Sequence, residues 1–243
     1  MNANYKNTIS AGIEPMWALS AVETEAIGLS LKVALWAVLV SVPLGVFAAW
    51  VLARRHFYGH ALLNGIIHLP LVLPPVVLGY LLLVLLGRQG PLGAFLFDTF
   101  GVTVAFTWKG AAIASGVMAF PLLVRAIRLS DENVEELLEA AARTLGAGRI
   151  KVFRTITLPL IAPGILAGAI LAFARSLGEF GATITFVSNI PGETRTLPLA
   201  IFAEVQSPGG EDAAIRLVVI SAAIALAALI ASEYLARRLG RKG

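Results

Sequence analysis

The sequence predicts an all-α membrane protein with five membrane-spanning helices. The chain of 243 residues is 58% hydrophobic and 14% charged, whereas a soluble domain carries about 25% charged residues. Its mean hydropathy is +0.83, and its apolar residues gather into stretches long enough to cross a hydrocarbon core of roughly 30 Å. A charged amphipathic segment between two of these stretches completes the pattern.

The expected spans cover residues 27–52, 61–86, 109–129, 160–187 and 213–235. The connectors between the second and third spans and between the fourth and fifth are too interrupted to cross a membrane. We expect an interfacial helix at 92–100 and an interfacial or re-entrant helix at 197–205. Residues 1–25 lack a basic start followed by an apolar core and a cleavage site, so we expect a tail rather than a signal peptide.

The first span contains Pro43 and Gly45, which favour a bend, and it ends at Arg54 and Arg55. His56 and His60 follow in a short loop. Such a pair is able to bind a metal ion, but in a loop at the membrane surface an interfacial role without a ligand is the more common one.

The second span contains Pro70, Pro74, Pro75 and Gly79. Each proline removes a backbone donor and disfavours helix just before it. Broken backbone at membrane depth is tolerated only where protein buries it or water reaches it. The span therefore lines a pathway or makes a tight helix contact, and its residues favour neither alternative.

The third span carries the small residues Gly110, Ala111, Ala112, Ala114, Ser115 and Gly116, which suit close helix packing. In the fourth, Arg175 and Glu179 are four residues apart and are expected to form an internal ion pair, because a lone charge in lipid is costly. That pair is either part of a gate or a structural salt bridge. Beside it, Ser176 and Thr183 offer hydroxyls and Gly178 loosens the helix.

The segment between the third and fourth spans is expected to form two short amphipathic helices. Arg143 near the end of the first helix and Gly146 just past it fit the helix dipole and a glycine stop, and a short basic helix is expected at 148–155, before Pro159 opens the next span. Acidic residues occupy the first turns of the first helix, and apolar residues recur along one side of it. The acids are Asp131, Glu132, Glu135, Glu136 and Glu139, and the apolar residues are Val134, Leu137, Leu138, Ala141 and Leu145. The segment is typical of a docking surface for a molecule outside the bilayer.

The basic residues predict the orientation, because cytoplasmic loops carry an excess of Lys and Arg. With the C-terminus inside, twelve lie in inner segments and five in outer ones. The inner residues are Arg54, Arg55, Arg125, Arg128, Arg143, Arg149, Lys151, Arg154, Arg237, Arg238, Arg241 and Lys242, and the outer residues are Lys6, Arg88, Lys109, Arg195 and Arg216. This distribution also accounts for the pI of about 9.7 without nucleic acid.

Motifs for catalysis are absent from the sequence. There is no phosphate-binding G-x4-G-K-[ST] motif, no Ser-His-Asp arrangement and no Cys, and there are three His. We therefore expect a passive conduit that another subunit moves, with no catalytic or metal-binding residue.

Residues of the charged segment resemble the cytoplasmic loop signature of ABC importer permeases. In that family a Glu-Ala-Ala run precedes a Gly, and Ile-x-Leu-Pro follows at a fixed spacing. Here Glu139 lies one position before the usual place of the acid, which Ala140 occupies. The matching residues are Glu139, Ala140, Ala141, Gly146, Ala147, Ile156, Leu158 and Pro159. The resemblance implies that a cytoplasmic ATPase binds this loop.

Three further stretches, at 67–75, 175–183 and 189–196, look like molybdate ABC transporter permeases and less closely like sulfate permeases. The resemblance implies a homodimeric type I permease of the bacterial inner membrane, in which residues 26–236 form the transmembrane domain. The distribution of basic residues predicts a periplasmic tail at 1–25 and a basic cytoplasmic tail at 237–243. The resemblance also implies two copies of an ATPase that holds ATP and Mg²⁺, a periplasmic molybdate-binding protein, and no cofactor in this chain.

The sequence leaves the cargo and the function class open. For an ABC permease, molybdate is the expected cargo, with tungstate or sulfate as alternatives, and the candidate pathway residues lie in the second and fourth spans. A secondary transporter driven by an ion gradient, with Arg175 and Glu179 as its coupling pair, is the alternative from another class. A membrane-embedded enzyme is disfavoured because catalytic groups are missing.

Overall fold

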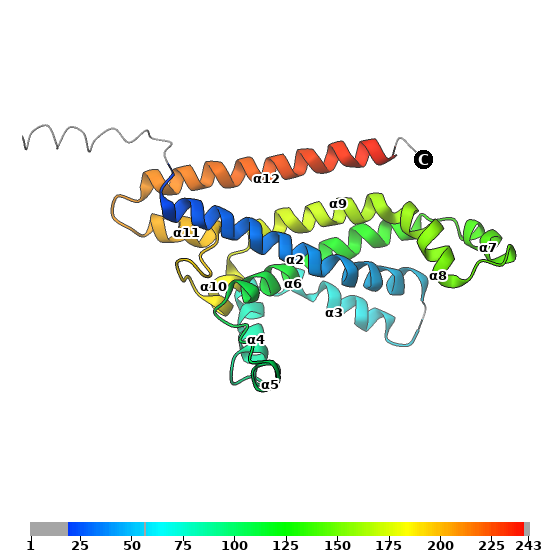
Figure 1. Cartoon of the computed structure of the whole chain (residues 1–243), viewed down its shortest axis with the longest axis horizontal. Coiled ribbons are helices and arrows are strands. Elements are labelled where there is room, and N and C mark those ends of the chain that lie inside the picture. Colours follow the sequence, from blue (N-terminus) through cyan, green and yellow to red (C-terminus); the bar gives the residue numbers. More distant parts are fainter. Residues whose placement is uncertain (1–18, 56, 241–243) are drawn as a thin grey trace, which may run out of the picture.

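The computed structural model describes residues 19–55 and 57–240, and these ranges contain helices and loops but no β-strand. Long helices run side by side along the long axis of the molecule (Figure 1). They are α2 (Ala21–Arg54), α6 (Trp108–Glu132), α9 (Leu158–Leu177) and α12 (Glu211–Gly240). The shorter helices are α3 (His60–Val72), α4 (Pro75–Leu86), α5 (Pro91–Phe100), α7 (Glu136–Thr144), α8 (Arg149–Val152), the π-helix η1 (Phe153–Thr157), α10 (Gly181–Val187) and α11 (Leu197–Val205).

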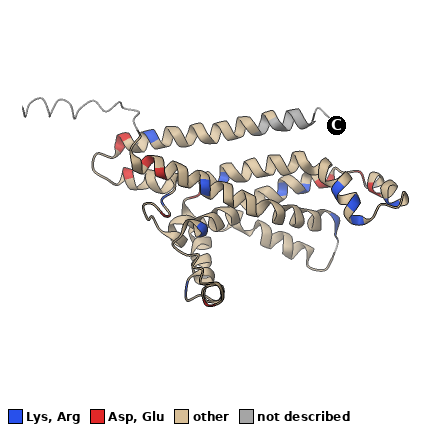
Figure 2. Ribbon diagram, viewed as in Figure 1, with Lys and Arg blue, Asp and Glu red and all other residues tan. Residues whose placement is uncertain are grey.

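Within the described residues, four helices are long and apolar enough to cross a membrane, and the bent pair of α3 and α4 brings the number to five when it is counted as one broken span. The prediction of an all-α chain with five spans is therefore confirmed. Charged residues lie mainly toward the two ends of the bundle, and its middle is largely uncharged (Figure 2). The predicted tail up to residue 18, His56 and residues 241–243 lie outside the described residues, as do the side chains of Arg237 and Arg238.

Helix α6 is the centre of the bundle, and α2 and α9 pack on it. Small residues make this packing close. A methyl group on Gly116 would lie 3.2 Å from Ser41 Oγ in α2, and one on Gly168 of α9 would lie 3.1 Å from the carbonyl oxygen of Leu123 in α6. The tight packing predicted for the third span is confirmed.

The second span is broken rather than merely kinked. Helix α3 ends at Val72 and α4 begins at Pro75, and the direction of the helix axis bends by 116° between them. Leu73 has φ −71° and ψ 141°, which is the extended conformation that a following proline imposes. As a result α4 and α5 project from the side of the bundle (Figure 1).

The predicted fourth span at 160–187 is wrong at its C-terminal end. Helix α9 stops at Leu177, and α10 is a separate helix. Gly178 has ψ 9°, and Phe180 has φ −126° and ψ −52°, so the ladder of backbone hydrogen bonds is interrupted between them. Hydropathy did not reveal this break because both flanking segments are apolar.

Both predicted connector helices are present, as α5 and α11. Helix α11 packs on α2 and α12, and Leu197 and Leu199 are buried there. His60 Nε2 donates a hydrogen bond to the carbonyl oxygen of Leu52 at 2.9 Å. Its ring is thus held by the end of α2.

Candidate functional site

The loop between α6 and α9 turns at Gly146, as the sequence predicts. Gly146 has φ +85°, the left-handed conformation that favours glycine. Its N–H donates to the carbonyl of Arg143 at 3.0 Å, and the N–H of Ala147 donates to that of Ala142 at 3.1 Å. These two bonds form a Schellman motif that closes α7.

This turn gives a prediction for its glycine. Nothing lies within 4 Å of a methyl group on either Gly146 or Gly148, so only backbone conformation separates the two sites. Gly146→Ala should lower stability by about 1–2 kcal/mol, because an L-residue is strained in the left-handed region. Gly148→Ala, at φ −67°, is the matched control and should be neutral. Thermal unfolding in detergent measures both, and equal effects would contradict the assignment.

The entry to the loop differs from its prediction. Asp131 and Glu132 do not begin the amphipathic helix but end α6, and α7 starts only at Glu136. The expected separate helix at 148–155 is also wrong. Helix α8 passes through η1 directly into α9, so one continuous helix covers Arg149–Leu177.

A π-helical turn occupies the junction between the loop and the span. Pro159 lies in the first turn of α9, where its ring crowds the carbonyl four residues earlier and its missing N–H leaves a gap in the ladder. The chain accommodates this by a wider turn at Phe153–Thr157, the usual consequence of such a defect. Ile156 lies in that turn, and Leu158 packs on the core beyond it.

The apolar residues at the tip of the loop face outward. Leu137, Leu145 and Ile150 are 78%, 88% and 77% exposed. Ala140 and Ala141 beside them are also exposed. Of the predicted apolar side of the first helix only Val134 is buried, and that residue precedes α7. The loop therefore presents apolar surface that nothing within the described chain covers.

The base of the loop is fixed to the bundle by Glu139, which is 8% exposed. Its Oε1 accepts a hydrogen bond from Thr157 Oγ1 at 2.6 Å and lies 3.3 Å from Arg54 at the end of α2. Its Oε2 accepts from Arg143 at 3.1 Å. One carboxylate thus joins α7, η1 and α2.

Arg54 joins that carboxylate to a second one. Its Nε and a terminal nitrogen donate to the two carboxylate oxygens of Asp131 at 3.2 Å and 2.9 Å, a bidentate geometry. Asp131 is 1% exposed. We call Arg54, Asp131, Glu139 and Thr157 the anchor cluster. It ties the loop to α2, to α6 and to the start of α9.

The sequence pointed to Glu139 but not to its partners. Arg54 and Asp131 are 77 positions apart, and no local pattern connects them. Thr157 lies within the matched loop signature, between Ile156 and Leu158, where a threonine carries no particular signal.

The second group of candidates gathers where α4 meets α10. A methyl group on Gly79 would lie 2.6 Å from the carbonyl oxygen of Ala182, and one on Gly181 would lie 2.7 Å from Pro75 Cβ. The two backbones therefore touch. Pro74 caps the start of α4, whereas Pro70 lies buried in α3, before the bend.

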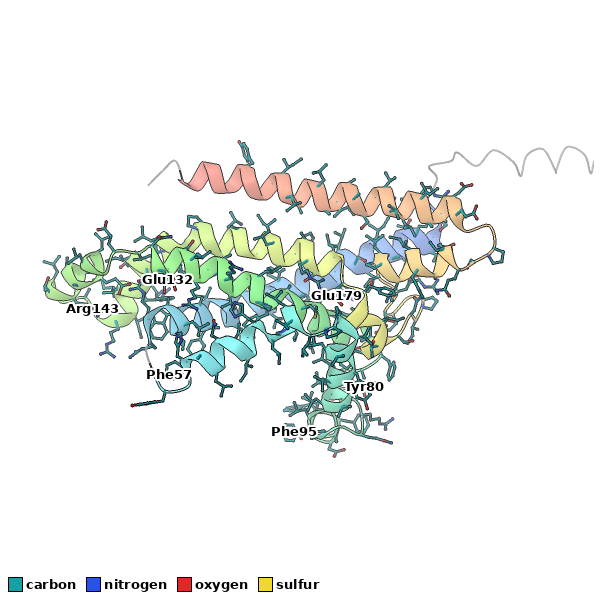
Figure 3. All side chains as sticks on the ribbon, turned by 180° about the vertical axis from the view of Figure 1, so that it is seen from behind. Phe57, Tyr80, Phe95, Glu132, Arg143 and Glu179 are labelled. Atoms are coloured by element: carbon teal, nitrogen blue, oxygen red, sulfur yellow. The ribbon has the colours of Figure 1, made fainter. Side chains whose placement is uncertain are left out.

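Arg175 and Glu179 form the expected ion pair, at 2.8 Å. Glu179 lies beyond the end of α9, and its Oε1 accepts a hydrogen bond from the N–H of Ala182 at 2.8 Å. The carboxylate therefore links the end of α9 to the first turn of α10, inside the molecule (Figure 3). Gly178 beside it forms the break between the two helices.

The hydroxyls of Thr183 and Ser176, near this pair, lie within hydrogen-bonding distance of backbone carbonyl oxygens. Thr183 is fully buried and donates to the carbonyl of Phe180 at 2.9 Å. Ser176 Oγ lies 3.5 Å from the carbonyl oxygen of Ser115 in α6. In this conformation both groups hold α9 and α10 in place. The pathway role of these residues stays a prediction.

Together the fold and the loop define a class of protein: a multi-pass membrane protein that carries an exposed loop tied to its spans by buried ion pairs. Residues 41–241 match the family model described as the binding-protein-dependent transport system inner membrane component. The chain belongs to this family of ABC importer permeases, and the resemblance seen in the loop signature is confirmed.

Individual relatives refine the comparison. The molybdenum transport system permease protein ModB of Escherichia coli K12 is 63% identical over 219 residues, which cover 90% of this chain and 96% of the relative. ModB of Haemophilus influenzae is 58% identical over 221 residues, 91% of this chain and 96% of the relative. The sulfate permease CysT of Salmonella typhimurium is 38% identical over 199 residues, 82% of this chain and 71% of the relative.

Solved structures agree with the fold. A bacterial ABC transporter involved in import of the acidic polysaccharide alginate aligns with TM-score 0.72 and 19% identity, over 96% of this chain and 89% of that chain. The MetNI methionine transporter aligns with TM-score 0.64 and 14% identity, over 93% and 99%.

Proposed function

We propose that this chain is the membrane permease of a molybdate importer. The observation that carries the proposal is that ModB of Escherichia coli K12 is 63% identical to this chain, whereas the sulfate permease CysT is 38% identical. The two relatives are named for different cargoes, so the higher identity to the molybdenum permease favours molybdate over sulfate. Molybdate and tungstate are both tetrahedral dianions, and we take tungstate as a second cargo.

We further propose that two copies enclose the path and that a separate ATPase drives them. A two-fold dimer is the most common closed assembly, and we place the second and fourth spans of both copies around its axis. The exposed tip of the loop, with Leu137, Leu145 and Ile150, is the ATPase docking surface. A periplasmic binding protein delivers the anion on the opposite side, with the N-terminus outside and the C-terminus in the cytoplasm.

The mechanism follows from the rigidity of the loop. Nucleotide binding brings the two ATPase subunits together and displaces the loops that they hold. Because the anchor cluster ties each loop to α2, α6 and α9, the displacement reaches the spans. Hydroxyls, glycine backbone and helix ends along the path offer weak donors to a dianion, which allows its release.

The docking surface gives a second prediction. Leu145→Asp should abolish copurification of the ATPase, because it puts a charge at the centre of an apolar contact. Leu145 is 88% exposed in this chain, so the thermal stability of the permease alone should not change. Leu145→Met, which keeps the apolar character, is the matched control. An ATPase that copurifies equally with both variants would remove this surface from the proposal.

The function itself is tested in proteoliposomes that contain the permease and its ATPase, with binding protein and molybdate outside. Accumulation should require ATP inside and should be reduced by tungstate more than by sulfate. Uptake driven by a proton gradient without ATP would instead support a secondary transporter. Stronger competition by sulfate would reassign the cargo.

A further inference from the structure

A cleft of about 960 Å³ lies between the last turns of α2 and the loop helices α7 and α8. Its lining is of two kinds. One part is apolar and aromatic, and the other is basic. The apolar part includes Pro43, Val46, Phe47, Trp50 and Phe153, and the basic part consists of Arg54, Arg55, Arg143 and Arg149.

The basic part carries excess positive charge. Glu139 is the carboxylate in the lining, and it is shared by Arg54 and Arg143. Among the described residues, Arg55 and Arg149 make no ion pair with a carboxylate. Both are exposed, and the guanidinium of Arg55 lies 5.3 Å from the centre of the Trp50 ring. The cleft therefore favours an anionic occupant at this end.

The two parts lie at different depths along a membrane span. Phe47 and Arg54 are seven positions apart in α2, which separates them by about 10 Å along the helix axis. Phe47 is 66% exposed within the span, and the arginines follow where the span ends. An occupant of the whole cleft is therefore apolar at one end and anionic at the other. A free inorganic anion would fill only the basic end.

We propose that this cleft binds one anionic phospholipid from the adjoining leaflet. Its phosphate lies between Arg55 and Arg149, and an acyl chain lies along Phe47 and Trp50. Because Arg149 belongs to α8 and Arg55 follows α2, the bound lipid joins the loop to the membrane surface. Leu137 and Ile150 of the proposed ATPase docking surface also line the cleft, so the lipid lies beside the ATPase, but its binding does not depend on the cargo.

The test is a titration of phosphatidylglycerol into the delipidated permease–ATPase complex, followed by native mass spectrometry. The double variant Arg55→Gln/Arg149→Gln should bind about thirtyfold more weakly, because two arginines near the surface no longer attract the phosphate. The control is Arg125→Gln/Lys151→Gln, which removes the same charge from two exposed residues outside the cleft. Its affinity should equal that of the wild type.

Several results would overturn the proposal: equal affinity of the cleft variant and the wild type, equal binding of phosphatidylcholine, or displacement of the lipid by molybdate or phosphate ions. Binding to the permease alone but not to the complex would also overturn it, because the partner would then fill the cleft. A thermal midpoint close to that of the wild type shows that the double variant is folded. The single variant Arg149→Gln, with an intermediate loss expected, is the second measurement.

Discussion

Replacing Arg54 by methionine is expected to lower the stability of the permease by about 3–5 kcal/mol and to abolish ATP-driven uptake. The substitution keeps an unbranched apolar stem but removes the guanidinium that Asp131 and Glu139 share. Asp131 has a side chain 1% exposed and Glu139 one 11% exposed, so water does not replace the lost partner. Thermal unfolding and uptake in proteoliposomes measure the two effects.

The matched control is Arg128→Met, which breaks the ion pair of Arg128 with Glu132. These side chains are 29% and 42% exposed, and such a surface pair contributes about 0–1 kcal/mol. The triple variant Arg54→Met/Asp131→Asn/Glu139→Gln should regain stability, because no uncompensated buried charge remains; Arg143, which loses Glu139 as its partner, is 55% exposed and stays hydrated. If Arg54→Met and Arg128→Met were equally mild, the anchor cluster would have no structural role.

The second large effect is expected for Gly79→Val in α4. The first atom of any side chain there would lie 2.6 Å from the carbonyl oxygen and 2.9 Å from Cα of Ala182. Both are backbone atoms, so α10 must move. Overpacking of this kind costs about 1–3 kcal/mol, and the altered contact between α4 and α10 should also stop transport. Uptake and thermal unfolding are the measurements.

Gly65→Val in α3 is the control for this substitution. It makes the same change within a helix of the same span, but nothing lies within 4 Å of the added methyl position. Stability and uptake should stay close to those of the wild type. Normal transport by Gly79→Val would show that the close contact between α4 and α10 is dispensable.

The parts of the fold that were predicted correctly have local causes. Apolar stretches of sufficient length mark the spans, consecutive prolines at Pro74 and Pro75 break the second one, and a glycine at φ +85° closes α7. The end of α9 was missed because Gly178 interrupts the helix without a change in hydropathy. Asp131 and Glu132 were placed in the wrong helix because acids favour a helix start, whereas at the end of α6 they are held by ion pairs with Arg54 and Arg128.

The site was predicted only in part, for a related reason. The loop signature identifies Glu139 from its neighbours, but its partner Arg54 comes from another span and is fixed only by tertiary packing. Likewise, the contact between Gly79 and Ala182 depends on the 116° bend that turns α4 toward α10. Neither contact leaves a pattern within one stretch of sequence.

The central claim is that the loop and the spans move as one body. The sequence has no Cys, so a single pair of spin labels is placed on Leu129→Cys at the end of α6 and Leu138→Cys in α7, both exposed positions, in one copy of the proposed dimer. In the complex with its ATPase, the distance between these two labels should be the same with and without ATP. The distribution of that distance should broaden when Arg54→Met is added. A distance that shifts on ATP binding while the wild-type anchor cluster is intact would contradict the account.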